Sequence, residues 1–260
     1  MKEISFTIIT TTYRRPELLE RAVKSVFAQT KSNWKLIVAN DSPEWDYAEF
    51  EKKYVSTDAR ITYIRNTVNK GKNFSVNKAF EQLHVTKFNG YIIFLDDDDW
   101  LATDCIEQFT KEIRENENNA WFVSKRSSIE GIDFVYNKTN SNTISYLYDT
   151  LLRRRFYGDT TQCIYFPLVH TCRFSDVVKN GEEWLYYYQV AQLSPTFIFI
   201  SVTGTYSEGY QENGLTRKKR TVTESLHLWK LLYREITTKK LWNFYILLYM
   251  MLRLFKNTFV

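Results

Sequence analysis

Strand-like runs of β-branched and apolar residues alternate, over the first hundred positions, with stretches whose apolar residues recur at helical spacing. The strand-like runs occupy residues 4–10, 35–39, 61–64 and 91–95. Helical spacing is found over residues 16–29 and 74–85, each between two of these runs. This alternation predicts βαβ units, and therefore an α/β fold with a mostly parallel sheet flanked by helices.

The pattern beyond residue 100 is less regular. Helix-like patterning covers residues 103–116 and 143–157, and strand-like runs lie within residues 120–136 and 197–203. The sequence contains no internal repeat, low-complexity stretch or Pro/Gly-rich linker. We therefore expect one continuous domain over residues 1–220, followed by a helical tail over residues 221–260.

Positive charge is concentrated in the tail. Residues 215–260 hold ten of the 35 Lys and Arg of the chain and only two Glu, so the net charge of +5 originates there. The longest apolar stretch of the tail, residues 241–252, falls short of the roughly 20 residues needed to span a bilayer. Because aromatic residues flank the cations, we expect an amphipathic tail that lies on an anionic membrane surface and binds no nucleic acid. The alternative is a tail packed on the rest of the chain, or on a second copy in a homo-oligomer.

Cysteine usage and the N-terminal residues bear on the cellular compartment. The three cysteines are odd in number and form no CxxC pair, which argues against a disulfide framework and a structural zinc site. The first ten residues have too short an apolar run for a secretory signal peptide. We expect a cytoplasmic protein, held by its tail on the inner face of the cell membrane.

Four consecutive aspartates follow the apolar run 91–95: Asp96, Asp97, Asp98 and Asp99. Carboxylates crowded at the end of a buried strand repel one another, and the local sequence offers no basic residue to balance them. A hard divalent cation would do so, and Mg²⁺ or Mn²⁺ commonly completes its coordination with substrate phosphates. The run therefore predicts a metal and diphosphate site. The alternative is a solvated acidic turn that caps the helix expected over residues 103–116.

Polar residues also follow the other expected strands. They lie at residues 10–15, 40–42 and 69–73. Because the carboxyl ends of parallel strands meet at one edge of a sheet, where ligands of such folds bind, these residues are expected to share one crevice. Tyr13 is suited to cover a base or ribose, and Asp41 is suited to accept a hydrogen bond from a base N–H or a ribose hydroxyl.

Four segments, in this order and spacing, resemble the nucleotide-binding half of glycosyltransferase family 2, the inverting enzymes with the GT-A fold: FTIITTTYRRPELLERAVKSVFAQT, KLIVANDS, ITYIRNTVNKGKNFSVNKAF and YIIFLDDDDWL. The resemblance is specific over residues 4–125. It implies a GT-A, Rossmann-like, mostly parallel sheet flanked by helices, in which residues 1–125 bind a nucleotide-sugar and residues 126–220 bind the acceptor.

The resemblance also implies roles for individual residues. The nucleotide-sugar would be contacted by Thr11, Thr12, Tyr13, Arg14, Asp41, Asn69, Gly71, Lys72, Asn77, Asp96 and Asp97. The DxD motif of the family maps onto the aspartate run, so that Asp98 and Asp99 would bind Mn²⁺ or Mg²⁺ and Asp96 would lie nearer the ribose. Val76 stands where an Arg on the diphosphate side is common, and Lys72 or Arg14 would compensate.

The general base of the family belongs to an acidic pair that follows the metal motif. Here Glu182 and Glu183 occupy the corresponding stretch, and the register places Glu183 at the base position. A carboxylate suffices because the acceptor hydroxyl loses its proton only as attack proceeds. The alternative is a solvated pair of loop charges. Many members also have a His in a late segment, where this sequence offers only Gln211 or Asn213.

The resemblance implies a metal-dependent, inverting transfer of a sugar, expected to come from a UDP-sugar, to a hydroxyl of a glycan or lipid-linked glycan acceptor. The process would be bacterial cell-surface polysaccharide biosynthesis. A sugar nucleotidyltransferase is one alternative, but it typically has a Gly-rich, basic phosphate loop after the first strand, which residues 10–17 do not form. A non-catalytic nucleotide-sugar-binding module is the other, because the acidic pair and the Val76 position depart from the family pattern.

Overall fold

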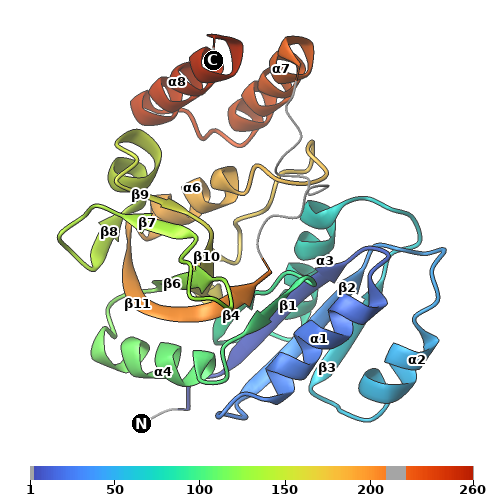
Figure 1. Ribbon diagram of the computed structural model, residues 1–260. Coiled ribbons are helices and arrows are strands. Elements are labelled where there is room, and N and C mark those ends of the chain that lie inside the picture. Colours follow the sequence, from blue (N-terminus) through green and yellow to red (C-terminus); the bar gives the residue numbers. More distant parts are fainter. Residues whose placement is uncertain (1–2, 209–220, 260) are drawn as a thin grey trace.

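The chain folds into a curled mixed sheet with helices on both faces (Figure 1). The computed structural model describes residues 3–208 and 221–259. Within these ranges the strands of the main sheet are β1 (Phe6–Thr12), β2 (Trp34–Asn40), β3 (Ile61–Arg65), β4 (Tyr91–Phe94), β5 (Asp99–Leu101), β6 (Trp121–Ser127), β8 (Thr143–Ser145), β10 (Thr160–Tyr165) and β11 (Thr196–Ser207). Two short strands, β7 (Val135–Asn137) and β9 (Phe156–Gly158), pair separately.

The helices that follow β1 and β3 lie where the sequence pattern predicts them, and a short helical stretch that the pattern does not predict follows β2. In the described ranges the helices are α1 (Pro16–Phe27), α2 (Ala48–Phe50), α3 (Lys72–Val85), α4 (Cys105–Glu115), α5 (Phe166–Val169), α6 (Trp184–Leu193), α7 (Val222–Thr238) and α8 (Phe244–Phe259), with π-helical segments η1 (Glu51–Val55) and η2 (Tyr146–Leu152). Helix α1 begins at Pro16, where the missing N–H costs nothing, and Glu17 lies at the positive end of its dipole. One face of α1 is buried, as its apolar spacing requires.

The first half of the sheet is parallel and confirms the predicted βαβ units. Strand β1 pairs in parallel with β2 and β4, and β2 pairs in parallel with β3. The second half is mixed, because β10 enters antiparallel between β4 and β6. The helix expected over residues 143–157 is only partly present. Its first residues form β8, where Ile144 pairs with Phe197 of β11, so an unsatisfied sheet edge overrides the helical pattern.

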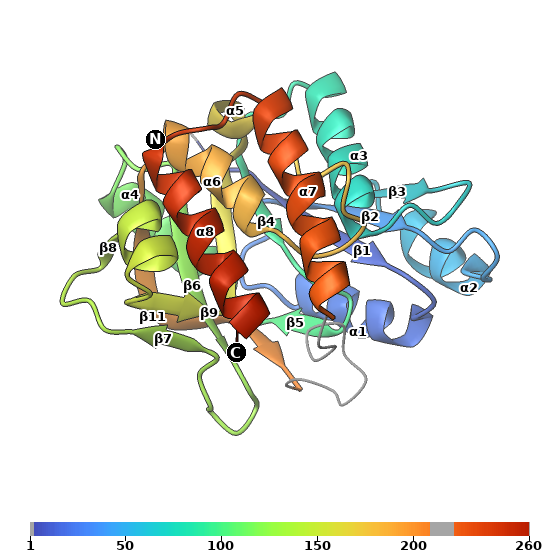
Figure 2. The same ribbon diagram turned by 90° about the horizontal axis from the view of Figure 1, so that it is seen from above.

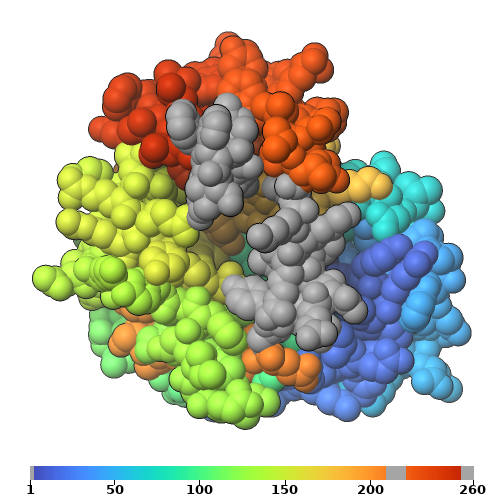
Figure 3. Space-filling model, turned by 45° about the horizontal axis from the view of Figure 1, so that its top comes forward, coloured from blue at the N-terminus to red at the C-terminus, as the bar shows by residue number. Residues whose placement is uncertain are grey.

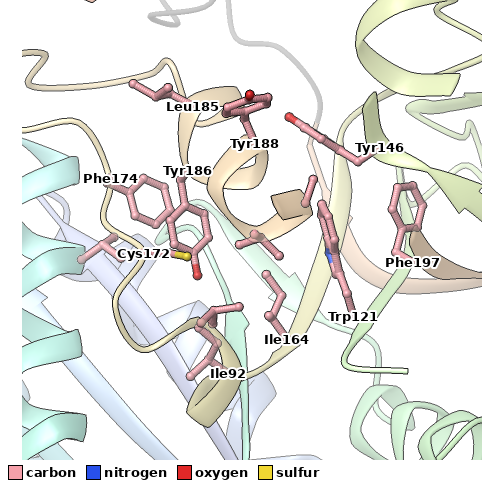
Figure 4. Packing of buried hydrophobic residues seen from close by; sticks show 14 of the residues in the cluster. Ile92, Trp121, Tyr146, Ile164, Cys172, Phe174, Leu185, Tyr186, Tyr188 and Phe197 are labelled. Atoms are coloured by element: carbon pink, nitrogen blue, oxygen red, sulfur yellow. The ribbon is translucent and has the colours of Figure 1, made fainter. Parts of the chain in front are cut away.

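Two hydrophobic clusters lie on the two faces of the sheet. One cluster includes the apolar residues of α1 and α4, and the other includes those of α3, α6, α7 and α8. Figure 4 shows the second cluster, in which Phe174 stacks on Tyr186 with ring centroids 4.3 Å apart. This cluster therefore links the first half of the chain to its last two helices.

The helical tail packs on the domain. Helices α7 and α8 lie side by side over α6 (Figures 1 and 2). Leu232 and Ile236 of α7 and Ile246 and Met250 of α8 are buried in the second cluster. The packing alternative of the sequence analysis is thus correct for the inner face of the tail. Among the helices within residues 3–208 and 221–259, none combines the length and the apolar character that crossing a membrane requires.

Candidate active site

The polar strand ends meet at one edge of the sheet, as expected. Thr12 at the end of β1 pairs in register with Asn40 at the end of β2. The aspartate run follows β4, which lies on the other side of β1. This edge is therefore formed by chain segments that are far apart in sequence.

Three of the four aspartates form a compact group. One carboxylate oxygen of each of Asp96, Asp98 and Asp99 lies within 4.8 Å of the others. The side chains of Asp96 and Asp98 are each 37% exposed, whereas Asp97 and Asp99 are buried. Oxygen ligands at this spacing fit a hard divalent cation such as Mg²⁺ or Mn²⁺. The two partly exposed carboxylates are the ones that a metal-bound diphosphate could reach.

Each aspartate has a basic partner from a distant part of the chain. Lys72 Nζ lies 2.6 Å from Asp96 Oδ1. Arg15 Nη1 lies 3.0 Å from Asp98 Oδ2 and 3.5 Å from Asp97 Oδ1. Arg126 Nη2 lies 2.8 Å from Asp99 Oδ1. The local sequence offers no basic residue to balance the acidic run, and folding supplies three cations from distant parts of the chain.

Burial changes the acidity of these carboxyls unequally. Desolvation raises the pKa of Asp97 to about 6, and it raises the pKa of Asp99 to about 7 although Arg126 opposes the shift. Burial also disfavours the charged form of Asp96, but the nearby Lys72 outweighs it and holds the pKa of Asp96 below its usual value. Folding therefore favours the charged form of Asp96, and it disfavours the charged forms of Asp97 and Asp99.

Arg15 and Arg126 are site residues that the sequence analysis did not identify. Arg15 directly precedes α1, and Arg126 lies on β6. The adjacent Arg14 was chosen instead, but its guanidinium pairs with the exposed Glu44, with Nε 2.7 Å from Oε1. The strand sequence around Arg126 carries no signal of its function, because basic residues on strands usually face solvent.

Asp41 lies beneath the turn that leads into α3. Its Oδ1 accepts hydrogen bonds from Asn66 Nδ2 at 2.8 Å and from the Lys70 backbone N–H at 2.9 Å. Its Oδ2 accepts from the Gly71 N–H at 2.6 Å. Gly71 has φ of +92°, and a Cβ there would lie 2.4 Å from the Lys179 carbonyl oxygen. Asp41 therefore shapes this turn, and the turn requires glycine.

The remaining residues expected to contact the nucleotide-sugar differ in accessibility. Tyr13 is exposed beyond the end of β1, and Asn69 is exposed in the turn. Thr12 is buried and shares a 3.2 Å hydrogen bond with the Tyr47 hydroxyl, while the neighbouring Thr11 is half-buried. Asn77 bonds to the backbone of the segment that follows α5: it donates to the Phe174 carbonyl and accepts from the Phe174 N–H.

Val76 and Lys72 occupy the two positions considered for a phosphate-binding cation. Val76 is buried in the hydrophobic core, so its position cannot face a diphosphate. Lys72 begins α3, and its ammonium lies at the acidic group. Between the two cations proposed to compensate for Val76, the structure brings Lys72 rather than Arg14 to the aspartate run.

The structure separates the two glutamates of the expected base pair. Glu182 is buried, has φ of +62° and accepts a 2.7 Å hydrogen bond from Trp184 Nε1. Glu183 is 38% exposed, and its Oε1 lies 4.0 Å from Lys72 Nζ. Lys72 therefore lies between Asp96 and Glu183, so Glu183 faces the aspartate run. Gln211 and Asn213, named as substitutes for a late His, lie outside the described residues.

Comparisons with known proteins identify the family of the chain. Residues 7–172 match the family model described as Glycosyl transferase family 2. The putative colanic acid biosynthesis glycosyl transferase WcaA of Escherichia coli (strain K12) is 38% identical over 91 residues, which are 34% of this chain and 30% of that protein. The GalNAc(5)-diNAcBac-PP-undecaprenol beta-1,3-glucosyltransferase of Campylobacter jejuni is 25% identical over 177 residues, which are 59% of this chain and 56% of that protein.

The fold has solved counterparts. The crystal structure of S. aureus TarS 1–349 in complex with UDP-GlcNAc superposes with a TM-score of 0.69 at 14% identity, covering 90% of this chain and 67% of that chain. This likeness confirms the expected GT-A fold. The chain spans about 30% of the length of WcaA and of the glycosyltransferase GlyA of Streptococcus pneumoniae.

Proposed function

The chain belongs to glycosyl transferase family 2, and we propose that it is a metal-dependent, inverting glycosyltransferase. It transfers a sugar from a UDP-sugar to a hydroxyl of a glycan or lipid-linked glycan in bacterial cell-surface polysaccharide biosynthesis. One observation carries the proposal: Lys72 lies between Asp96 of the acidic group and Glu183 at the same edge of the sheet. The candidate metal site, through Asp96, and the candidate base Glu183 thus lie on either side of the Lys72 ammonium.

The donor binds across the ends of the first strands, with residues 1–125 forming the donor half. Tyr13 covers the base or ribose, and Asp41, whose backbone N–H donates to the Thr12 carbonyl, holds the turn before α3. Asp98, with Asp96 and Asp99, holds Mn²⁺ or Mg²⁺, since their carboxylate oxygens lie within 4.8 Å of one another. When bound, the ion supplies positive charge that stabilises the departing diphosphate. A relative whose name specifies a diphosphoundecaprenol acceptor supports a lipid-linked acceptor for this chain.

Glu183 acts as the general base. The acceptor oxygen forms a bond to the anomeric carbon, the bond from that carbon to the UDP oxygen breaks, and the hydroxyl proton passes to Glu183. Attack from the face opposite the nucleotide inverts the anomeric configuration. Lys72 keeps Asp96 ionised and places its ammonium 4.0 Å from Glu183 Oε1. Residues 126–220 form the acceptor half.

Helices α7 and α8 hold the protein on the inner face of an anionic membrane. Figure 3 shows these helices forming the upper part of one face of the molecule. The exposed apolar side chains of α8 include Phe244, Tyr245, Leu247, Met251 and Leu252, of which Phe244 is 73% exposed. Exposed cations of α7 include Lys230 and Arg234, and the basic run 217–220 lies outside the described residues. Apolar and cationic groups together favour an anionic lipid surface.

Nucleotide release tests the enzymatic proposal. The protein is incubated with UDP-GlcNAc, UDP-glucose and GDP-mannose, with and without Mn²⁺ and with a membrane extract as the source of acceptor. We expect UDP release from one UDP-sugar, only with Mn²⁺. Synthesis of a nucleotide-sugar from a nucleoside triphosphate and a sugar phosphate would instead identify a nucleotidyltransferase. Donor binding without release under all conditions would identify a binding module.

A further inference from the structure

Helix α7 contributes a buried carboxylate that the proposed mechanism does not use. Glu235 is only 6% exposed. Its Oε2 accepts a 2.6 Å hydrogen bond from the Ser175 hydroxyl, and its Oε1 lies 2.6 Å from Lys239 Nζ. A buried charge is retained only where it is paired and hydrogen-bonded, and both oxygens of Glu235 are. The carboxylate is therefore held in place by Lys239, at the C-terminal end of α7, and by Ser175, in the segment that follows α5.

Ser175 links Glu235 to the backbone of residues 177 and 178. While its hydroxyl donates to Glu235, the same oxygen accepts from the Val177 N–H at 3.4 Å and the Val178 N–H at 3.2 Å. Such a turn depends on the orientation of the hydroxyl. Lys239 adds a second link, because its Nζ lies 3.8 Å from Asp176 Oδ2. Helix α7 thus anchors residues 175–178.

The first residues of α3 hold the opposite side of the same segment. Asn73 Nδ2 donates to the Val178 carbonyl at 2.8 Å and to the Gly181 carbonyl at 3.1 Å. The Lys72 N–H donates to Asn180 Oδ1 at 2.9 Å. The segment therefore lies clamped between α3, which borders the aspartate run, and α7. In Figure 2, α7 lies over the region between α3 and α6.

The clamped segment ends at the candidate base. Gly181 and Glu182 have φ of +77° and +62°, so two successive left-handed residues precede Glu183. This reversal turns Glu182 inward to Trp184 and leaves Glu183 facing Lys72. A non-glycine residue in this conformation persists only when its surroundings hold it there. Helix α8 also supports this conformation, because the ring of Tyr249 packs edge-on against Trp184, with ring centroids 4.9 Å apart.

We propose that Glu235 is a positioning residue: through Ser175 it fixes the segment that presents Glu183 to the acceptor hydroxyl. The terminal helices are then part of the catalytic scaffold as well as a candidate membrane surface. This proposal rests on the proposed function of Glu183 as base. A small displacement of a reacting group is enough to lower the rate by up to about 10²-fold. The contact between Glu235 and Ser175 can therefore affect the rate without touching the substrate.

The test compares Glu235→Gln, Glu235→Ala and Ser175→Ala in the full chain. His227→Gln is the matched control, because it changes a polar side chain at an exposed position of the same helix. We expect Glu235→Ala and Ser175→Ala to lower kcat at least tenfold while changing UDP affinity in Mn²⁺ less than about twofold. Glu235→Gln retains an acceptor for Ser175 and should recover part of the rate. His227→Gln should behave as wild type.

Hydrogen–deuterium exchange provides a readout that is independent of turnover. Amides of residues 177–183 should exchange faster in Glu235→Ala and Ser175→Ala, with β1 to β4 unchanged. Unchanged kcat and unchanged exchange in folded variants would overturn the proposal, as would equal losses of kcat and UDP affinity. If Glu183→Gln proves fully active, the proposed base is wrong. Faster exchange at 177–183 with a reduced kcat would then still support positioning by Glu235.

Discussion

Lys72 donates a 2.6 Å hydrogen bond to Asp96, although 24 positions separate the two residues in the sequence. Lys72 begins α3 and Asp96 follows β4, so their contact depends on the packing of a helix against the sheet. The contact lowers the pKa of Asp96 and raises that of Lys72, against the effect of burial on both. Lys72 and Asp96 therefore form a fixed charge pair at the site.

The first prediction concerns the metal. Asp98→Asn should retain the fold but lose Mn²⁺-dependent UDP binding and most turnover, because an amide cannot replace a carboxylate facing a hard divalent ion. Calorimetric titration of UDP with and without Mn²⁺ measures this. Asp46→Asn is the control, since this exposed residue accepts a bond from the Ala48 N–H that an asparagine oxygen can also accept. Equal Mn²⁺ dependence in wild type and Asp98→Asn would remove Asp98 from the metal site.

The second prediction concerns the base. Glu183→Gln should leave UDP-sugar affinity nearly unchanged and slow the chemical step by roughly 10²–10⁴-fold, the usual contribution of a positioned general base. Glu182→Gln should have a far smaller effect, because a glutamine oxygen can still accept from Trp184 Nε1. Single-turnover kinetics with saturating donor separates the two. The reverse order of effects would assign the base to Glu182, and two fully active variants would place it elsewhere.

The third prediction concerns the turn before α3. Gly71→Ala should destabilise the protein by roughly 1–3 kcal/mol, the typical cost of a strained backbone conformation, and should weaken UDP binding. The strain is compounded by a Cβ position 2.4 Å from the Lys179 carbonyl oxygen. Gly131→Ala is the control: Gly131 has φ of +83° but open space around its Cβ position. Denaturant unfolding should show the larger loss for Gly71→Ala, and equal losses would mean that the close approach to Lys179 is unimportant.

The fourth prediction concerns the outward face of the tail. Phe244→Asn, Leu247→Asn and Met251→Asn combined should abolish sedimentation with anionic vesicles while UDP binding persists. Apolar side chains contribute roughly 1.5–3 kcal/mol each when fully buried, and each Lys or Arg near the surface adds about 1 kcal/mol. Substitution is a sharper test than truncation, because removing the tail would expose core residues such as Ile236 and Ile246.

The control for the tail is Ile129→Asn with Ile132→Asn, which removes exposed apolar side chains far along the chain from the tail. This variant should sediment with vesicles as wild type does. High salt should weaken the wild-type interaction only in part, because the apolar term is not screened. If the wild-type protein does not sediment with anionic vesicles but dimerises through the outward face of α8, that face is a subunit contact instead.

Local spacing was sufficient to predict the first half of the fold. The apolar residues of α1 and α3 recur at helical intervals, and β1 and β4 are short runs of β-branched and apolar residues. The local sequence of each element therefore indicates its type and which of its residues are buried. The polar ends of parallel strands meet at one edge of a sheet. This rule then predicted that the aspartate run after β4 lies near the polar residues that follow the other strands. The edge strand β8 was not predicted, because its conformation depends on β11, about fifty residues away.

Only the tertiary structure decided which side chains meet within the site. The acidic group is balanced by Arg15, Lys72 and Arg126, which come from three separate elements. Likewise, Glu182 and Glu183 are adjacent and chemically alike, and the left-handed φ of Glu182 sends them in opposite directions. The hydrophobic period of a segment is a local property, whereas the distance between two charges depends on how whole helices pack on the sheet. That packing is encoded in the entire chain and not in any one motif.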